Sequence, residues 1–368
     1  MSVAYREEAT LTISWTEVTG AIGDSITVLP IVVTVAVLSD LSLATMLVWF
    51  GVFQIVWGLY YGVPVSVEPM KALAALVIAG TITTGELLVA GIGLSLALLA
   101  IGATRSLTHL ERLIGSPVVR GVQFGVALVL LETGVRLGSG DLLLAGVAVA
   151  VTLALIALGY RQLSALAVFA VGGVVVAFQT GMPAPAIPPI GGQVLFGPGD
   201  LSIPAAEATL AQLAMTLGNA ALATSVLLAD YFDRDTSPDE LSASMGVMNL
   251  VAIPLGGFPM CHGSGGVAGK YAFGARTAGA NVILGLGYVL VAVLAVGFVA
   301  AYPVAVLGVI LALIALQLGS TSLDRTDEHL FVVAVGALGL AFNLGLAFVV
   351  GIGAHLLLRW RRPERFRG

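Results

Sequence analysis

A few polar and ionisable residues lie inside long apolar runs, and they are the side chains of this chain that could do chemistry. They offer carboxylates, hydroxyls, an amide, an imidazole and an amine, which can hold an anion or exchange a proton: Asp24, Ser25, Glu68, Lys71, Glu132, Asn219, His262 and Ser264. A charge at bilayer depth costs about 3 kcal/mol or more, so each is a candidate functional residue. For each there is also a structural interpretation, such as a helix cap at His262 or a hydrogen bond that joins helices at Asp24.

The stretch Gly256–Gly279 is the most unusual of these regions. It combines many glycines with Pro259, and it carries His262 and Ser264 between apolar runs. Glycines let the backbone approach a ligand closely, and irregular backbone at membrane depth must be buried in protein or line a cavity. We therefore expect an extended segment at 258–260 and then a helix that begins near residues 262–264. The free N–H groups at the start of that helix would favour an anion.

A second stretch, residues 62–71, repeats this design. Gly62 and Pro64 stand 195 residues before Gly257 and Pro259, and the same spacing aligns Asp24 with Asn219. Broken apolar segments at corresponding positions of two halves are typical of a transporter's binding site. We expect two half-helices whose N-termini face one cavity.

These stretches must be positioned by membrane-spanning helices. The chain has 368 residues, of which 58% are hydrophobic and 10% charged, and this composition excludes an ordinary soluble domain. We predict an all-α polytopic membrane protein with about fourteen transmembrane segments, in two inverted repeats of seven, and with broken half-helices at spans 3 and 10. Several spans are short, so a miscount by one or two stays open. The predicted spans are Val18–Leu38, Leu43–Tyr61, Val63–Ala79, Leu87–Ala103, Val118–Val135, Leu142–Leu158, Leu163–Phe178, Ala208–Leu228, Leu241–Leu255, the stretch Gly256–Gly279, Ala280–Ala301, Val304–Leu318, and two within His329–Leu358.

The predicted repeats occupy residues 1–180 and 205–368, joined by an extracellular linker at 181–204 that is rich in proline and glycine. Basic residues favour the cytoplasmic side, and placing both termini there leaves only Arg136 outside among the basic loop residues. Residues 106–116 are predicted to form an amphipathic helix at the membrane interface. Lys270 and Arg276 are expected to flank the cytoplasmic end of span 10.

At these residues the chain resembles a known family. Residues 258–266 (FPMCHGSGG) and 268–276 (AGKYAFGAR) resemble the second signature of the molybdate transporter family related to SulP anion transporters, and residues 64–72 resemble the first. Residues 20–24 and 217–219 are similar to the family's spans 1 and 8, so the resemblance covers nearly the whole chain. It implies a seven-plus-seven inverted repeat like that of uracil permease, with core and gate bundles and an oxyanion site between spans 3 and 10. Two points differ: Glu68 stands where the family usually has glutamine, and the C-terminal regulatory domain of many SulP proteins is absent.

We therefore expect a secondary transporter of molybdate, with tungstate and sulfate as related substrates, that works by an elevator-type mechanism in the cytoplasmic membrane. The residues expected to bind the substrate are Asp24, Ser25, Pro64, Glu68, Pro69, Lys71, Asn219, Cys261, His262, Gly263, Ser264 and Gly265. Glu68 is the expected proton carrier, because a protonated carboxyl can donate to the oxyanion and proton and anion binding then favour each other. A nucleobase–cation symporter on the same fold and a passive anion channel stay open as alternatives.

Other classes find no support in the sequence. There is no Walker A motif, and the glycines at 263–266 lack the strand–helix–strand context of a dinucleotide site. Cys261 is the single cysteine, which excludes a disulfide within the chain, and the four histidines are scattered. We expect no enzymatic activity, cofactor, metal or nucleic-acid partner. The lipid bilayer is the expected surrounding, and a homodimer is one option for the assembly.

Overall fold

The computed structural model describes residues 11–181, 197–294 and 301–361, and these are mostly helical. Within this part of the chain, five helical runs are long and apolar enough to cross a bilayer, as the composition predicts. They are α2 (Leu43–Tyr61), α4 (Thr84–Thr104), α6 (Ser116–Gly138), α15 (Val304–Asp324) and the run Ile203–Phe232, which comprises α9 (Ile203–Met215), the π-helical segment η3 (Thr216–Ala223) and α10 (Thr224–Phe232).

The remaining helices are shorter, apart from α1 (Trp15–Leu38), which is long and apolar but bent within its length. Those of the first half are α1 (Trp15–Leu38), α3 (Lys71–Ala79), α5 (Leu107–Ile114), α7 (Leu142–Ala157), the 3-10 turn η1 (Arg161–Leu163) and α8 (Ser164–Thr180). Those of the second half are the 3-10 turn η2 (Pro198–Asp200), α11 (Pro238–Ala252), the 3-10 turn η4 (Ile253–Leu255), α12 (Ser264–Ala272), α13 (Gly279–Leu294), α16 (His329–Ala341) and α17 (Leu344–Arg361).

Local capping fixes many of these helix starts. Hydroxyl or carboxyl side chains accept hydrogen bonds from first-turn N–H groups at Ser14, Ser42, Thr83, Asp141, Ser202 and Ser237. The helix predicted at residues 106–116 is present as α5, which buries Leu107 and Ile114 and exposes its other face; its place at the membrane interface stays a prediction. The predicted span at 43–61 coincides with α2, and the region predicted to hold two spans, His329–Leu358, contains α16 and α17, which are separated at residues 342–343. Most of the predicted linker, residues 182–196, and the end of the predicted span 280–301 lie outside the described residues.

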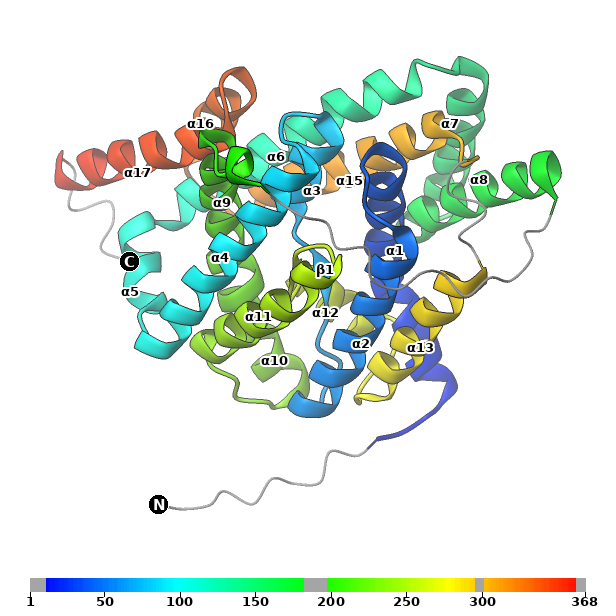
Figure 1. Cartoon of the computed structure of the whole chain (residues 1–368), viewed down its shortest axis with the longest axis horizontal. Coiled ribbons are helices and arrows are strands. Elements are labelled where there is room, and N and C mark those ends of the chain that lie inside the picture. The colour runs from blue at the N-terminus through cyan, green and yellow to red at the C-terminus, as the bar shows by residue number, and fades with distance from the viewer. Residues whose placement is uncertain (1–10, 182–196, 295–300, 362–368) are drawn as a thin grey trace.

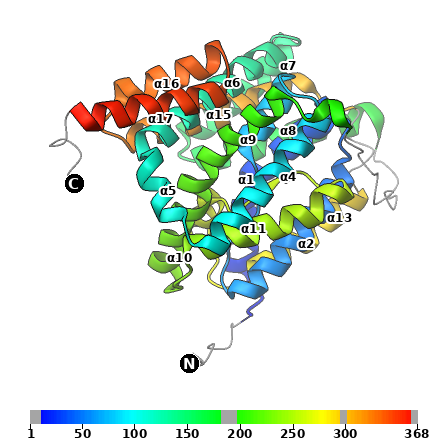
Figure 2. The same cartoon turned by 60° about the vertical axis from the view of Figure 1, so that its left-hand side comes forward.

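The helices pack in two groups. α1–α4 pack with α9–α13, chiefly through the pairs α2·α13, α4·α11 and α1·α12, while α6–α8 pack with α15–α17 around the central pair α6·α15. Figures 1 and 2 show α6, α15 and α16 along the upper side of the molecule and α2, α11 and α13 along the lower side. We call these two groups the core group and the gate group. The two groups meet through α3·α6, α1·α15 and α9·α17.

Two short strands pair at the centre of the core group, where the sequence predicted two broken spans, and we call this place the crossing. β1 (Glu68–Pro69) pairs with β2 (Met260–Cys261) in antiparallel fashion, and each strand leads into a nine-residue helix, α3 or α12. The preceding helices end at Gly62 and Gly256, which both adopt the left-handed conformation that glycine favours. The predicted arrangement of an extended segment followed by a half-helix is thus confirmed at both places.

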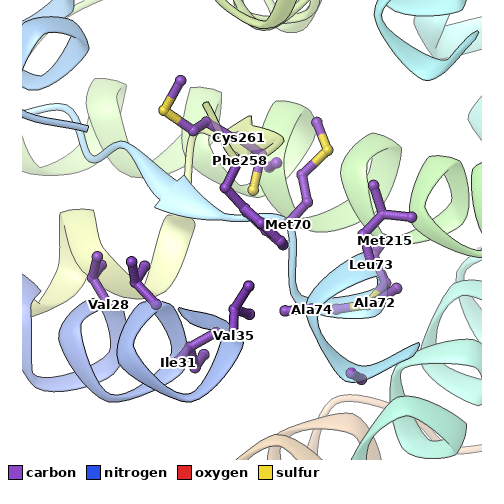
Figure 3. Close-up of a cluster of buried hydrophobic side chains, with 14 of the residues drawn as sticks. Val28, Ile31, Val35, Met70, Ala72, Leu73, Ala74, Met215, Phe258 and Cys261 are labelled. Carbon is purple, nitrogen blue, oxygen red and sulfur yellow. The ribbon is translucent and has the colours of Figure 1, made fainter. Parts of the chain in front are cut away.

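Apolar side chains enclose this crossing. Figure 3 shows Val28, Ile31 and Val35 of α1 close to Met70 and Phe258, which lie beside the two strands. All five side chains are at most 1% exposed, so the crossing sits in the main hydrophobic core. Irregular backbone here is shielded from lipid, as membrane proteins require.

Candidate anion-binding site

The paired strands bring the start of α3 next to the start of α12. Glu68 lies opposite Cys261 and Pro69 opposite Met260, and the Met70 N–H donates to the Pro259 carbonyl at 2.9 Å. Proline has no N–H and disfavours helix at the preceding residue, so Pro69 and Pro259 keep both approaches extended until each helix begins.

The Glu68 carboxylate lies on the N-terminus of α12. The Gly266 N–H donates to Glu68 Oε1 at 2.6 Å, and the Lys71 ammonium forms an ion pair with Oε2. A Cβ added at Gly263 would lie 2.1 Å from Glu68 Cδ, so a glycine is needed there for the carboxyl group to come this close. A helix N-terminus beside an ammonium group is a suitable site for an anion, and in this structure a side-chain carboxylate fills it.

The same helix end is open on one side. Gly265 is exposed, although Ser264 and Gly266 on either side of it are buried. Apart from its chain neighbours and the backbone of its own helix, the one described atom within 4 Å of a Cβ added at Gly265 would be Glu68 Oε1, at 4.0 Å. The Lys71 side chain keeps 14% of its surface exposed. An anion could therefore approach the first turn of α12 next to Glu68 and Lys71.

The N-terminus of α3 does not share this opening. The N–H groups of Ala72 and Leu73 both donate to Gln212 Oε1 of α9, at 2.8 and 3.4 Å. A neutral amide thus satisfies the donors of α3, whereas a carboxylate satisfies a donor of α12. An anion at the crossing would therefore meet free donors of α12 rather than those of α3, and one cavity shared by both helix ends stays a prediction.

Ser264 and Asn219 meet, although they are far apart in the sequence. Ser264 Oγ donates to Asn219 Oδ1 at 2.5 Å, and Asn219 lies in the π-helical segment η3. Such segments are frequent at functional sites because they disturb the regular helix ladder. The contact joins α12 to the run α9–α10 next to the exposed Gly265.

His262 is held by two buried partners. Its Nδ1 lies 3.0 Å from the Ser66 carbonyl, and its Nε2 lies 2.8 Å from Ser244 Oγ, which also receives a hydrogen bond from the Tyr61 hydroxyl. The carbonyl can only accept, so Nδ1 carries the proton and Nε2 is the acceptor; it faces the Ser244 hydroxyl, whose single proton is also within reach of the Leu241 carbonyl at 2.9 Å. Neither ring nitrogen is left for an anion in this conformation, and His262 does not cap α12 either, because its partners lie in the segment before β1 and in α11.

Asp24 belongs to a sealed ion pair. Lys270 Nζ lies 3.1 Å from Asp24 Oδ2, and both side chains are fully buried. The Asp24 carboxylate also accepts from Ser66 Oγ at 2.6 Å and from Gln54 Nε2 at 2.8 Å. Lys270 donates to three further oxygens: Gln54 Oε1, the Val65 carbonyl and Asn281 Oδ1. The prediction that Lys270 flanks the cytoplasmic end of span 10 was wrong, because its amine is drawn into the protein by this carboxylate and these oxygens.

The other predicted residues surround these contacts without an evident free group. Ser25 is buried on α1 and donates to the Ala21 carbonyl, while Pro64, Pro69 and Cys261 are buried in the extended segments. Glu132 is exposed on α6, away from the crossing. Among the described residues, no group of three or more His, Cys, Asp or Glu side chains is placed to hold a metal ion.

Several buried amides at the crossing were not singled out from the sequence. Gln54, Asn281 and Gln212 contribute to the contacts above, and Asn249 bonds both the N–H and the carbonyl of Met260. Each is an uncharged polar side chain in an apolar helix, and that is the signal that could have identified them, because such amides require partners inside the protein.

Comparison with known proteins places the chain in a family. A profile of the family described as "Molybdate transporter of MFS superfamily" matches residues 16–130 and 204–318, two stretches of equal length. Molybdate transporter 2 and molybdate transporter 1 of Arabidopsis thaliana are each 29% identical to the chain over 94% of its length, covering 87% and 88% of their own. Molybdate transporter 1 of Chlamydomonas reinhardtii is 25% identical over 92% of this chain and 90% of its own.

Solved structures share the fold. The transmembrane domain of the cyanobacterial bicarbonate transporter BicA superposes with a TM-score of 0.67 at 18% identity, over 92% of this chain and 98% of that one. SLC26A9 superposes with a TM-score of 0.69 at 12% identity, over 93% of this chain and 64% of that one. Relatives and fold neighbours alike are transporters rather than enzymes. The chain is thus a multi-pass membrane protein, and it belongs to the molybdate transporter family.

Proposed function

We propose that the protein is a secondary active transporter of molybdate, and that the oxyanion binds at the N-terminus of α12. One observation carries the proposal: the Gly266 N–H already holds a carboxylate, Glu68, at 2.6 Å on a helix end that is open at Gly265. The names of the relatives support molybdate as the substrate. Tungstate and sulfate share its tetrahedral shape and double charge, so they are the substrates to compare.

The Glu68 carboxylate acts as a stand-in for the substrate in this arrangement. It occupies the donor at Gly266, and it neutralises Lys71 while no oxyanion is bound. An incoming dianion would meet a like charge at short distance and low dielectric, and that repulsion is strong. The substrate therefore has to displace Glu68 from the helix end or to bind when its carboxyl group is neutral.

Protonation of Glu68 resolves this conflict. A neutral carboxyl group no longer competes for Lys71, and its O–H can donate a hydrogen bond to the oxyanion. Proton binding and anion binding then favour each other by the same factor, which is the thermodynamic basis of symport. We accordingly assign proton coupling to Glu68, with Lys71 changing partner from the carboxylate to the substrate.

We further propose that the described helices form two inverted repeats of seven spans each. The first consists of α1–α4 and α6–α8, and the second of the run α9–α10 with α11–α13 and α15–α17. Two facts support this: the family profile matches two stretches of equal length, and the third element of each repeat is a nine-residue half-helix. The core group would move against the gate group in an elevator-type cycle and carry the site at α12 with it.

The orientation of the protein in the membrane follows from this assignment of the spans. Both termini would be cytoplasmic and the protein would lie in the cytoplasmic membrane, because this placement puts most loop arginines inside. The oligomeric state stays open, with a homodimer as one option.

Two measurements test the function. A thermal-shift panel of molybdate, sulfate and uracil on the purified protein should show stabilisation by molybdate, about 2.7 kcal/mol at a ligand concentration a hundred times Kd. A shift with uracil but with neither oxyanion would overturn the anion site. Uptake into proteoliposomes should then concentrate molybdate when an inward proton gradient is applied, and a flux that only equilibrates molybdate would indicate a channel.

A further inference from the structure

A second basic site lies far from the crossing, where α5, α6 and α17 meet. It is a cavity of about 230 Å³. Its lining includes Glu111, Arg112, Gly115, Ser116, His355 and Arg359. Arg112 and Arg359 are exposed at its rim, and His355 is buried against Gly115, where an added Cβ would lie 2.3 Å from His355 Nε2. We call this cavity the α5–α17 pocket.

The two arginines of this pocket are positioned together but not neutralised. Arg359 Nη1 donates to the Arg112 carbonyl at 3.1 Å, which fixes the end of α17 on the last turn of α5. Within the part of the chain that the structure describes, neither guanidinium has a carboxylate within 4.0 Å, although Glu111 also lines the pocket. Ser116 adds the start of α6, but Pro117 has no N–H and the N–H groups of Val118 and Val119 donate to the Gly115 carbonyl at 3.1 and 3.4 Å, so the two guanidinium groups are the main donors for a ligand. The pocket thus presents two guanidinium groups outside any close ion pair, with Glu111 in its lining and Glu328 near His355.

The surroundings of the pocket are apolar and exposed. Leu113 on α5 is 46% exposed, and on α17 Leu357 is 49% and Trp360 is 79% exposed. An amphipathic helix with arginine on its polar face and exposed leucine beside it is suited to the plane of the membrane interface, and tryptophan is enriched at the same depth. The sequence after Trp360 adds four more arginines, at positions 361, 362, 365 and 367. Basic clusters next to the end of a membrane helix attract anionic lipids.

We propose that the α5–α17 pocket binds the headgroup phosphate of an anionic phospholipid from the adjacent leaflet. Arg112 and Arg359 would hold the phosphate oxygens, and the acyl chains would lie along the exposed leucines of α5 and α17. A free oxyanion would use the same charges, but it would gain nothing from the apolar rim. This inference does not depend on the substrate proposed above, because the pocket lies outside the strand crossing and shares no residue with it.

Tryptophan quenching tests the proposal directly, because Trp360 follows Arg359. The purified transporter is titrated with mixed micelles that contain brominated phosphatidylglycerol, with brominated phosphatidylcholine as the lipid control. We expect saturable quenching by phosphatidylglycerol at low lipid content, weaker quenching by phosphatidylcholine, and loss of most of the difference in Trp360→Phe, which identifies the reporting residue. Inorganic phosphate at millimolar concentration should not reverse the quenching.

Charge-neutral variants complete the test. A basic residue near an anionic membrane surface strengthens lipid binding by a factor of about five, so Arg112→Gln with Arg359→Gln should weaken phosphatidylglycerol binding about 25-fold. Arg136→Gln is the matched control, because Arg136 lines a cavity at the other end of α6, and it should bind like the parent. Thermal unfolding of the double variant without ligand checks that it is folded. Unchanged phosphatidylglycerol binding in the double variant, equal binding of both lipids, or full displacement by phosphate would each overturn the proposal.

Discussion

Gly265→Ala is the sharpest perturbation of the proposed anion site, because it separates binding from folding. Gly265 is the second residue of α12 and the only exposed one among residues 261–270. An added Cβ there would meet a single atom, Glu68 Oε1, at 4.0 Å, so the methyl group would enter open space rather than the packed interior. The space it would fill is the space through which an oxyanion has to reach the helix end.

The structure gives the size of both effects. Alanine is favoured over glycine inside a helix by about 1 kcal/mol, and Gly265 has no positive φ to strain, so the variant should be as stable as the parent or slightly more stable. The methyl group should keep the oxyanion from one charge-assisted hydrogen bond, worth about 1.5 to 3 kcal/mol. The expected loss in molybdate affinity is therefore about 10- to 150-fold.

The assay combines thermal unfolding without ligand, the molybdate-induced thermal shift, and uptake into proteoliposomes. Gly146→Ala is the matched control: it also replaces a glycine inside a helix, α7, with nothing within 4 Å of the added Cβ. The control should keep parental affinity and uptake. If Gly265→Ala binds and transports molybdate like the control, the anion does not approach the first turn of α12, and the site is elsewhere.

The remaining predictions concern the buried charges. Molybdate affinity of the parent should rise as pH falls, because protonated Glu68 favours the anion. Glu68→Gln should still bind molybdate but lose both this pH dependence and proton-driven accumulation. Thermal shift and uptake at several pH values measure these effects. Asp24→Asn and Lys270→Gln should each destabilise the protein by about 3 to 5 kcal/mol, because each leaves a buried charge unpaired. The double variant should lose less stability than the two single variants lose together, and chemical unfolding of all three variants measures these free energies. Glu17 accepts three backbone N–H groups at and just before the start of α13, each at 3.0 Å, so Glu17→Ala should cost about 1 to 3 kcal/mol in thermal unfolding while uptake per folded molecule stays unchanged.

The sequence predicted the broken spans well because the signal is local. Gly62, Pro64, Pro69 and Pro259 interrupt apolar runs, and each acts on the backbone within one or two residues of itself. The position of α3 and α12 therefore followed from residue type alone. The pairing of β1 with β2 was not predicted, because two-residue strands have no periodicity to detect and their partners lie almost two hundred residues apart.

The partners of the charged side chains could not be predicted in the same way. Lys270 occurs near Tyr271 and Arg276 in the sequence and looks like part of a basic flank, yet α12 turns it inward toward Asp24. Its destination depends on the register of α12 against α1, which no local pattern encodes. The same holds for His262, whose two partners, Ser66 and Ser244, come from the extended segment before β1 and from α11.

Two lysine–carboxylate pairs lie at the N-terminus of α12, and they differ in how close they are to the opening at Gly265. Gly266 lies between the two carboxylates: a Cβ there would be 2.1 Å from Asp24 Oδ1 and 2.5 Å from Glu68 Oε1. The pair of Asp24 with Lys270 is fully buried and bonded on all sides, so it holds α12 against α1 in a fixed charge state. The pair of Glu68 with Lys71 has the same charges but borders the opening at Gly265. With both pairs intact the site is neutral, so a dianion would bring a net charge of two negative units. In the proposed mechanism a proton on Glu68 frees Lys71 to pair with one of these charges, which leaves a net charge of one negative unit. Of the two pairs, the one that borders the opening is therefore the one that we propose exchanges its partner, while the pair of Asp24 with Lys270 keeps the helix end in place.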